Sequence, residues 1–353
     1  MKKIYQDTTF YFLIFIIAYF IYVYPFEILN ELLFNDKPSR KNSFLYTFFI
    51  SALIIFYFRS KNTFSVLKLF IYEGMGIGFI SFWVINSFLI FGFFFSINNI
   101  ILGYSSLIII FFITIYGLIN GRRVVFKNIK IDSTIFNTNQ NFIFISDVHL
   151  GTNPISYFEK ILKLINKYDY DFILIGGDLI DSSSFDISKL DILKKIKKPI
   201  FFVTGNHEYY ITDFSNKISS LANFNITHLK NSNIVFNNIN LIGINDNQTL
   251  KKQSLIVKQL SKKNLFNLVL VHKPSVWNLI YDESDLMLAG HTHNGQIFPF
   301  NFFVRLQFKH KYGLFAKNKS QLYVSSGAAC WGPRIRFGTN NEIVYFQLKS
   351  NNN

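Results

Sequence analysis

The chain has 353 residues, of which 50% are hydrophobic, and it carries a formal net charge of +15 at pH 7. Its single cysteine, Cys330, excludes an intrachain disulfide and a cysteine-based zinc site. Charge is unevenly distributed, because residues 1–120 hold eight Lys/Arg and five Asp/Glu, which leaves +12 on the remainder. These features predict an apolar first third and a basic, polar remainder.

Three uncharged runs rich in Phe, Ile, Leu and Tyr occupy the first third, at Thr8–Phe26, Asn42–Phe58 and Gly74–Gly121. A membrane-spanning helix needs about 20 apolar residues, so the first two runs predict one span each. The third run has 48 residues, enough for two spans with Asn98-Asn99 at the turn. We therefore predict a transmembrane region of four helices over residues 1–121.

The basic residues predict the orientation of these spans. Lys2 and Lys3 would also fit a secretory signal peptide, but no small-residue cleavage pattern follows the first run. The segments that would lie inside hold nine Lys/Arg, and the outer segments hold only Lys37, Arg40 and Lys41. The positive-inside rule then predicts a multi-pass protein of the cell membrane whose C-terminal domain faces the cytosol.

After an expected linker at 122–139, strand and helix patterns alternate over residues 140–349. An amphipathic helix is expected at Tyr157–Asn166, and a further helix is expected near Ile187–Ile196. Runs of β-formers predict strands at 142–146, 172–176, 200–203, 234–236, 241–244, 268–271, 286–289, 321–325 and 343–348. Alternation alone predicts an α/β fold with a doubly wound sheet. The tail Ser350–Asn353 is expected to be disordered.

Five short polar motifs each follow one of these strands. In chain order they are Asp147-Val-His149, Gly177-Asp178-Leu-Ile-Asp181, Gly205-Asn206-His207-Glu208, His272 in Val-His-Lys-Pro, and Gly290-His291-Thr-His293. Side chains placed where strands run into loops can converge on one cleft of an α/β sheet. Carboxylate, imidazole and carboxamide donors together suit a pair of divalent cations, with manganese, iron or zinc the metals expected.

The charge of such a cluster would favour a phosphate anion. Two divalent cations bring four positive charges, whereas Asp147, Asp178 and a bridging hydroxide bring three negative ones. The imidazoles and the amide of Asn206 add no charge. Each histidine alone could equally be an ordinary core or loop residue, but five within ordered motifs indicate a site.

Together the motifs resemble the calcineurin-like metallophosphoesterases over roughly residues 140–348. The resemblance implies an α/β/β/α sandwich of two mixed sheets and a two-metal phosphoester hydrolase that attacks phosphorus with metal-bound hydroxide. It assigns Asp147, His149, Asp178 and His293 to one metal, and Asp178, Asn206, His272 and His291 to the other. His207 would face the phosphate and act in catalysis.

The remaining motif residues are expected to support the metal residues. Asp181 and Glu208 would orient ligands or clamp loops, while Gly205 and Gly290 would relieve backbone crowding. His310 is expected to be a solvated residue of a basic loop. His228 is expected to be an ordinary surface histidine.

Further motifs resemble a membrane-associated bacterial branch of the family, some members of which hydrolyse the pyrophosphate of UDP-diacylglucosamine. They include Gly295-Gln296, Tyr312-Gly313-Leu314 and Trp331-Gly332-Pro333, although Asn294 stands where the branch often has Gly. The segment Gln296–Tyr312 carries five Phe beside Arg305, Lys309 and Lys311. It could close the core, or it could form a flap that dips into the headgroup boundary and guides a lipid-linked substrate.

Three functions stay open from the sequence. The favoured one is a membrane-embedded phosphodiesterase or pyrophosphatase that acts on a lipid-linked substrate. The alternatives are a non-catalytic membrane scaffold or sensor that only binds metal or ligand, and a tethered phosphodiesterase for soluble nucleotides. An anionic bilayer explains the basic charge of the domain more directly than nucleic acid, which is not expected as a partner.

Overall fold

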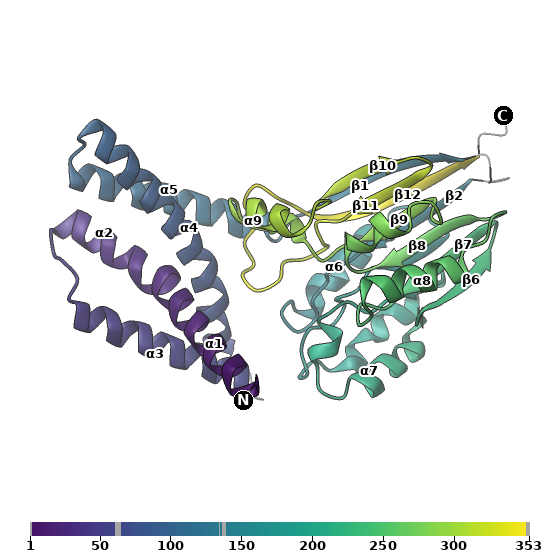
Figure 1. Ribbon diagram of the computed structural model, residues 1–353, viewed down its shortest axis with the longest axis horizontal. Coiled ribbons are helices and arrows are strands. Elements are labelled where there is room, and N and C mark those ends of the chain that lie inside the picture. Colours follow the sequence, from purple (N-terminus) through teal and green to yellow (C-terminus); the bar gives the residue numbers. More distant parts are fainter. Residues whose placement is uncertain (1, 61–64, 134, 136–138, 351–353) are drawn as a thin grey trace. The chain divides into compact units, whose positions relative to one another are not determined.

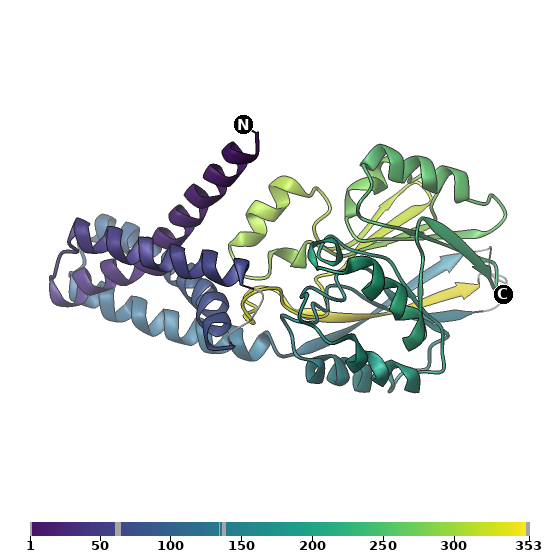
Figure 2. The same ribbon diagram turned by 90° about the horizontal axis from the view of Figure 1, so that it is seen from below.

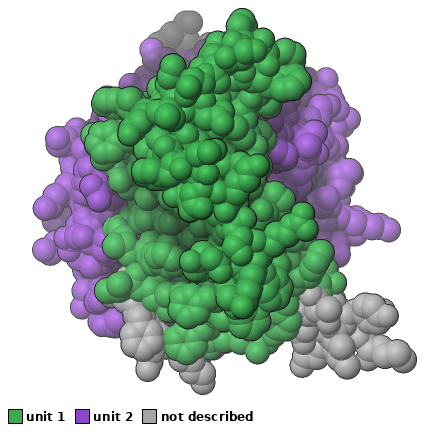
Figure 3. All heavy atoms as spheres, turned by 90° about the vertical axis from the view of Figure 1, so that its left-hand side faces the viewer, with its two compact units in different colours: residues 1–119, 332–337 green, residues 120–331, 338–353 purple. Residues whose placement is uncertain are grey.

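The computed structural model describes residues 2–60, 65–133, 135 and 139–350, and it divides into two compact units. The first unit comprises residues 1–119 and 332–337, and the second comprises residues 120–331 and 338–353. Figure 3 colours the two units separately. Residues 351–353 of the expected disordered tail lie outside the described residues, whereas Ser350 ends a strand.

The first unit contains four helices that are long and apolar enough to cross a membrane, as the sequence predicted (Figure 1). The candidate spans are Thr9–Phe34, Arg40–Arg59, Val66–Phe95 and Asn99–Asn120. The helices that form them are α1 (Lys2–Ile17), α2 (Tyr24–Phe34), α3 (Arg40–Arg59), α4 (Ser65–Phe95) and α5 (Asn99–Asn120). Asn98 and Asn99 lie at the turn between the last two spans, where they were expected.

The first span is continuous because a π-helical segment, η1 (Ala18–Val23), joins α1 to α2. This segment lies just before Pro25, whose missing N–H and bulky ring disturb the preceding turn of an α-helix. Helix α4 approaches the segment closely at Gly78, where a Cβ would lie 1.9 Å from the carbonyl oxygen of Ile21. Only glycine permits this approach of two helices.

The hexapeptide Gly332–Phe337 packs within the first unit although it comes late in the chain. The Arg334 side chain pairs with the Glu73 carboxylate at 3.0 Å, and the backbone N–H of Arg334 donates to the same carboxylate. The N–H of Arg336 donates to the carbonyl of Gly117 in α5 at 3.0 Å. The two contacts of Arg334 satisfy the charge of Glu73, which lies inside a candidate span.

The second unit is a sandwich of two six-stranded mixed sheets, which confirms the fold expected from the family resemblance (Figures 1 and 2). One sheet has the order β1 (Val124–Ser133), β12 (Asn341–Ser350), β2 (Gln140–Ile145), β3 (Phe172–Ile175), β4 (Ile200–Phe202) and β5 (Ile226–His228). The other has the order β10 (Gly313–Lys317), β11 (Ser320–Val324), β9 (Leu286–Ala289), β8 (Phe266–Val271), β7 (Ile239–Ile244) and β6 (Ser232–Phe236). All nine strands predicted from the sequence are present.

Alternating side chains build the layers. Phe142 and Phe144 of β2 enter the core between the sheets, whereas Ile143 and Ile145 enter the outer core under α6 (Ile155–Ile165). On the other sheet, β9 and α8 (Leu250–Leu260) line a third core that includes Met287 and Val257. The period of two along each strand therefore covers both faces of both sheets with apolar side chains.

One local expectation is wrong, and another is confirmed with a different type of helix. Residues 124–133 of the expected linker form β1, which pairs with β12 in parallel over ten positions. Charged and polar residues interrupt the apolar residues of this strand, so the sequence shows no continuous run of β-formers here. The expected helix at 187–196 is a 3₁₀ helix, η2 (Ile187–Lys195), in which Leu190 and Leu193 are both buried. Their spacing of three residues fits the three-residue turn of a 3₁₀ helix.

Candidate metal centre

The five motifs begin at one kind of position, the carboxyl end of a strand. Asp147 follows β2, Asp178 follows β3 and Asn206 follows β4, while His272 and His291 follow β8 and β9 of the other sheet. Strands β2, β3 and β4 are mutually parallel, as are β8 and β9. The sequence expectation that these side chains converge is supported by the distances between them.

Many of these residues have an unusual backbone conformation. Five of the seven predicted metal residues have positive φ, namely Asp147 (56°), His149 (51°), Asp178 (52°), His291 (72°) and His293 (47°). Non-glycine residues in this left-handed region typically cost about 1–3 kcal/mol each, and they cluster at functional sites. Their presence here shows that the fold accepts backbone strain in order to aim these side chains.

Asp147, His149 and His293 form the first group of donors. His149 Nε2 lies 3.1 Å from His293 Nε2, and His293 Nε2 lies 3.4 Å from Asp147 Oδ1. Two ligands held about 2.1 Å from a common ion lie roughly 3–3.4 Å apart. The spacing therefore fits one divalent cation.

Asp178, His272 and His291 form the second group. His272 Nε2 lies 3.1 Å from Asp178 Oδ2 and 3.2 Å from His291 Nδ1. The other ring nitrogen of His272 lies 2.9 Å from the carbonyl oxygen of Gly176, so in the neutral ring that nitrogen carries the proton and Nε2 has the lone pair. This tautomer is the one that a metal requires.

Asp178 connects the groups, because its Oδ2 also lies 3.9 Å from His149 Nε2 of the first group.

Asn206 independently tests whether the predicted site fits metal ions. Its Oδ1 is buried and has no hydrogen-bond partner, which is costly for a carboxamide oxygen unless a cation binds it. The donor set therefore fits a pair of divalent cations.

The charges of the site are strongly coupled. Burial raises the pKa of Asp147 despite the nearby histidines. Although burial opposes it, the charge of His272 and its hydrogen bond hold the pKa of Asp178 well below its usual range. Conversely, burial acts to lower the pKa of His272, but Asp178 raises it to about 10. Without cations, this cluster thus retains a proton that metal binding would displace.

His207 lies at the mouth of this cluster, with 18% of its side chain exposed. Its Nε2 is 4.0 Å from Asp178 Oδ2, and its ring meets that of His149 edge-on at 4.8 Å. Burial lowers the pKa of His207 to about 4, so its imidazole is neutral at pH 7. The position agrees with its expected place beside the metal residues.

Asp181 and Glu208 contact the predicted metal residues and their loops. Asp181 Oδ2 lies 3.4 Å from His149 Nδ1, and Asp181 Oδ1 accepts the N–H of Thr152. Glu208 is fully buried and accepts backbone N–H groups from Gly205, Asp178 and Ile180 at 2.7, 3.1 and 3.0 Å. Glu208 therefore joins the loop after β3 to the loop after β4. Burial, reinforced by Asp178, raises its pKa to about 7.

Two glycines permit the loops to meet. A Cβ at Gly205 would lie 2.2 Å from Asp178 Oδ1, and one at Gly290 would lie 2.3 Å from Asp147 Oδ2. Any side chain at either position would displace a predicted metal residue, as expected from the sequence.

Sequence reasoning missed two neighbours of the site. The hydroxyl of Ser146 donates to Asp147 Oδ2 at 2.5 Å, and Trp331 lies with its ring 5.4 Å from that of His207. Ser146 could have been suspected from its place before Asp147. The contact of Trp331 joins residues 124 positions apart, and no sequence signal indicates it.

The two histidines outside the motifs differ from expectation. His228 is half-buried, and its Nε2 lies 3.0 Å from Asn245 Oδ1, so it is not an ordinary surface histidine. His310 is also half-buried, between the rings of Trp277 and Phe315 at 5.0 and 4.8 Å. His310 is not solvated because it packs against these two rings. The flanking Lys309 and Lys311 had suggested a solvated loop.

Comparisons with known proteins identify the family of the chain. Residues 141–295 match the family of calcineurin-like phosphoesterases. An uncharacterized metallophosphoesterase of Campylobacter jejuni is 34% identical over 262 residues, which is 69% of each chain. The chain belongs to the calcineurin-like metallophosphoesterase family.

Two further relatives extend the comparison. An uncharacterized metallophosphoesterase of Helicobacter pylori is 36% identical over 60% of each chain, so the present chain spans less than two thirds of that relative. A "transmembrane protein with metallophosphoesterase domain" of Danio rerio is 29% identical over 69% of this chain and 62% of its own length. With four apolar helices, this likeness indicates that the metallophosphoesterase is membrane-associated.

Proposed function

We propose that this metallophosphoesterase is anchored in the membrane and hydrolyses a phosphodiester or pyrophosphate with two divalent cations. The observation that carries the proposal is the pair of donor groups joined by Asp178. The buried oxygen of Asn206, in the loop after β4, has no hydrogen-bond partner and agrees with it. A buried carboxamide oxygen without a partner is costly, and a bound cation would satisfy it.

The donor atoms divide into two sets. Asp147, His149, Asp178 and His293 would hold one cation, and Asp178, Asn206, His272 and His291 would hold the other. When bound, the cations would supply positive charge for the phosphate and would activate the attacking water. Mixed oxygen and nitrogen donors suit manganese, iron or zinc.

His207 would bind the phosphate directly. Because its imidazole is neutral, it can donate one N–H to a non-bridging phosphate oxygen. In hydrolysis, the water oxygen bonds to phosphorus while the bond from phosphorus to the leaving oxygen breaks, and that oxygen must gain a proton. A bound phosphate anion would raise the pKa of His207, which would allow it to supply this proton.

The exposed side chains of helix α9 (Phe300–Gln307) support the proposal that the substrate is lipid-linked. It begins seven residues after His293, and none of its residues is buried. Phe302 is 57% exposed, Phe303 is 47% exposed and Leu306 is 87% exposed, so these side chains do not close the core. Exposed Arg305 lies on the same helix, an arrangement typical of helices that lie in the headgroup boundary.

The proposed place of the protein is the cell membrane, with four passes and the catalytic domain in the cytosol. The excess of basic residues in the segments that would lie inside supports this orientation. The sequence likeness to enzymes that act on UDP-diacylglucosamine supports testing a lipid-linked pyrophosphate among other substrates.

The test is activity of the detergent-solubilised full chain on phosphodiesters, pyrophosphates and phosphomonoesters. We expect metal-dependent hydrolysis of a diester or pyrophosphate, with close to two divalent ions per chain by elemental analysis. A protein that binds two metals yet hydrolyses no member of the panel would instead support the scaffold or sensor. A preference for soluble nucleotides would support the tethered nucleotide phosphodiesterase.

A further inference from the structure

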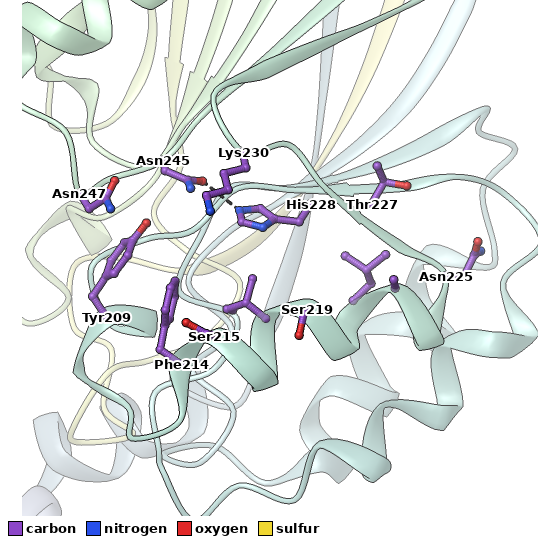
Figure 4. A pocket seen from close by; sticks show the side chains of 13 residues that line it. Tyr209, Phe214, Ser215, Ser219, Asn225, Thr227, His228, Lys230, Asn245 and Asn247 are labelled. Carbon is purple, nitrogen blue, oxygen red and sulfur yellow. Dashed lines mark hydrogen bonds between the residues drawn. The ribbon is translucent and has the colours of Figure 1, made fainter.

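A pocket of about 590 Å³ lies in the second unit, at the ends of strands that carry no predicted metal residue (Figure 4). In one sheet, the predicted metal residues follow β2, β3 and β4, and β5 is the next strand. In the other sheet they follow β9 and β8, and β7 is the next strand. His228 ends β5, Asn245 follows β7, and the two side chains meet at 3.0 Å within the pocket. The pocket therefore continues the edge of the sandwich on which the donor groups lie.

Two contacts join the pocket to the loops of the metal centre. The hydroxyl of Tyr209, which lines the pocket, lies 2.8 Å from the hydroxyl of Thr204, two residues before Asn206. Lys273, which directly follows His272, pairs with Asp246 at 2.6 Å, and Asp246 lies between two lining residues of the pocket. The pocket and the predicted metal centre are therefore built from neighbouring positions of the same loops.

The lining of the pocket favours an uncharged ligand with hydroxyl groups. The side chains of Tyr209, Lys230, Asn245 and Asn247 gather at one end, as Figure 4 shows. Hydroxyls and carboxamides both donate and accept hydrogen bonds, as sugar hydroxyls do. No carboxylate is among the described lining residues, so a cationic ligand would find no partner.

The other walls are apolar or neutral. Phe214 contributes an aromatic wall, packed against Tyr209 at 4.6 Å, and Ile218 and Ile226 are buried beneath. Burial lowers the pKa of His228, which is therefore neutral at pH 7. Lys230, which is exposed, is the one lysine or arginine among the described lining residues. The volume lies within the range of about 300–1,000 Å³ that is typical of small-molecule sites.

We infer that this pocket binds a polyhydroxylated ring, the ribose or hexose part of the substrate, while its phosphate lies at the metal centre. The inference rests on the proposed phosphoesterase activity and names the group that gives the enzyme its specificity. The exposed amide of Asn247 would contact ring hydroxyls, and Phe214 would cover the apolar face of the ring.

Three chromogenic diesters with the same leaving group test this inference on the full chain in detergent. They are the p-nitrophenyl phosphodiesters of glucose (at O1), of uridine (at the 5′ position) and of phenol. In each, water adds to phosphorus and p-nitrophenol leaves, so only the retained group differs. We expect kcat/KM for the glucosyl or the uridyl diester to exceed that for the phenyl diester at least tenfold. Whichever of the glucosyl and uridyl diesters has the higher kcat/KM shows whether the pocket prefers a hexose or a ribose.

A variant that fills the pocket should abolish this preference. Ala222 is exposed and lines the pocket, so Ala222→Phe should bring the ratio of sugar to phenyl kcat/KM to near one. The adjacent Asn223 is exposed and lies outside the lining, so Asn223→Phe serves as the matched control and should keep the ratio. If Ala222→Phe does not fold, Asn247→Leu on the opposite wall should reduce the ratio at least threefold.

The outcomes separate the two proposals. Equal kcat/KM for all three diesters, or a preference that survives Ala222→Phe and Asn247→Leu, would overturn the sugar pocket and leave the phosphoesterase intact. No hydrolysis of any diester by protein that holds two metals would reject the diesterase activity and, with it, a sugar pocket that serves it. A preference lost equally in Asn223→Phe would also overturn the inference.

Discussion

Asp178 is the residue on which both donor groups depend, because its Oδ2 lies within 4 Å of a histidine from each group. Replacement by Asn removes one negative charge but nearly preserves the shape. Since changes around metal ligands already cost roughly 10–100-fold in affinity or activity, loss of a shared ligand should cost more. We expect Asp178→Asn to lose at least one of two metals per chain, by elemental analysis, together with most activity. Unchanged metal content would contradict the shared-ligand role.

His207 should behave differently, because it lies beside the donor groups and keeps part of its surface exposed. His207→Ala should lower kcat by about 10²–10⁴-fold, the usual contribution of a general acid or base, while metal content remains that of the wild type. The same elemental analysis and rate measurement check this. Full activity of the variant would remove His207 from the chemistry, and a loss of metal would make it a ligand.

At the scale of elements, α9 is the part of the second unit best suited to meet lipid. If Phe302 and Phe303 enter the headgroup boundary, Phe302→Ser/Phe303→Ser should reduce turnover of a lipid-linked phosphoester at least about fivefold, because burial of each ring is lost. Turnover of a small chromogenic diester should stay within twofold. Leu314→Ser on β10, where the side chain is 48% exposed, is the matched control. Equal losses on both substrates would remove the support for a lipid-linked substrate.

The elements that the sequence predicted are those with a strong local signal. The nine predicted strands are runs of β-formers buried on one or both faces, and the four apolar helices follow from length alone. Strand β5 was missed because Ile226, Thr227 and His228 are too few to show a period. Strand β10 was missed because three of its five residues, Gly313, Ala316 and Lys317, are weak β-formers.

The site was predictable for a different reason. Its donors lie in five motifs, each of which follows one strand, so the chain itself marks their positions. The contact of Trp331 with His207 and the bond between His228 and Asn245 join distant positions and depend on the packing of two sheets. Such contacts have no local signature, which is why the pocket beside the metal centre could not be foreseen.

At the scale of the whole molecule, the two units are not two consecutive segments of the chain. The hexapeptide Gly332–Phe337 belongs to the first unit, although the residues before and after it belong to the second. Its Arg334 pairs with Glu73 of α4, and Gly76 of the same helix leaves room for Pro333 and Ile335. A Cβ at Gly76 would lie 2.8 Å from either side chain. The first unit therefore consists of the N-terminal helices together with residues 332–337, which come late in the sequence.

The number of spans and the distribution of basic residues together determine on which side of the membrane the catalytic domain should lie. Four spans would return the chain to the side on which it began, and the positive-inside rule predicts a cytosolic place for the Lys-containing start. A reporter fused after Asn353, or after Lys68 in a truncated chain, should therefore read as cytosolic. A reporter inserted in the Asp36–Lys41 segment between α2 and α3 should read as external. An external reading after Asn353 with a cytosolic reading after Lys68 would mean that α4 and α5 cross the membrane only once, and the catalytic domain would then meet substrates outside the cytosol.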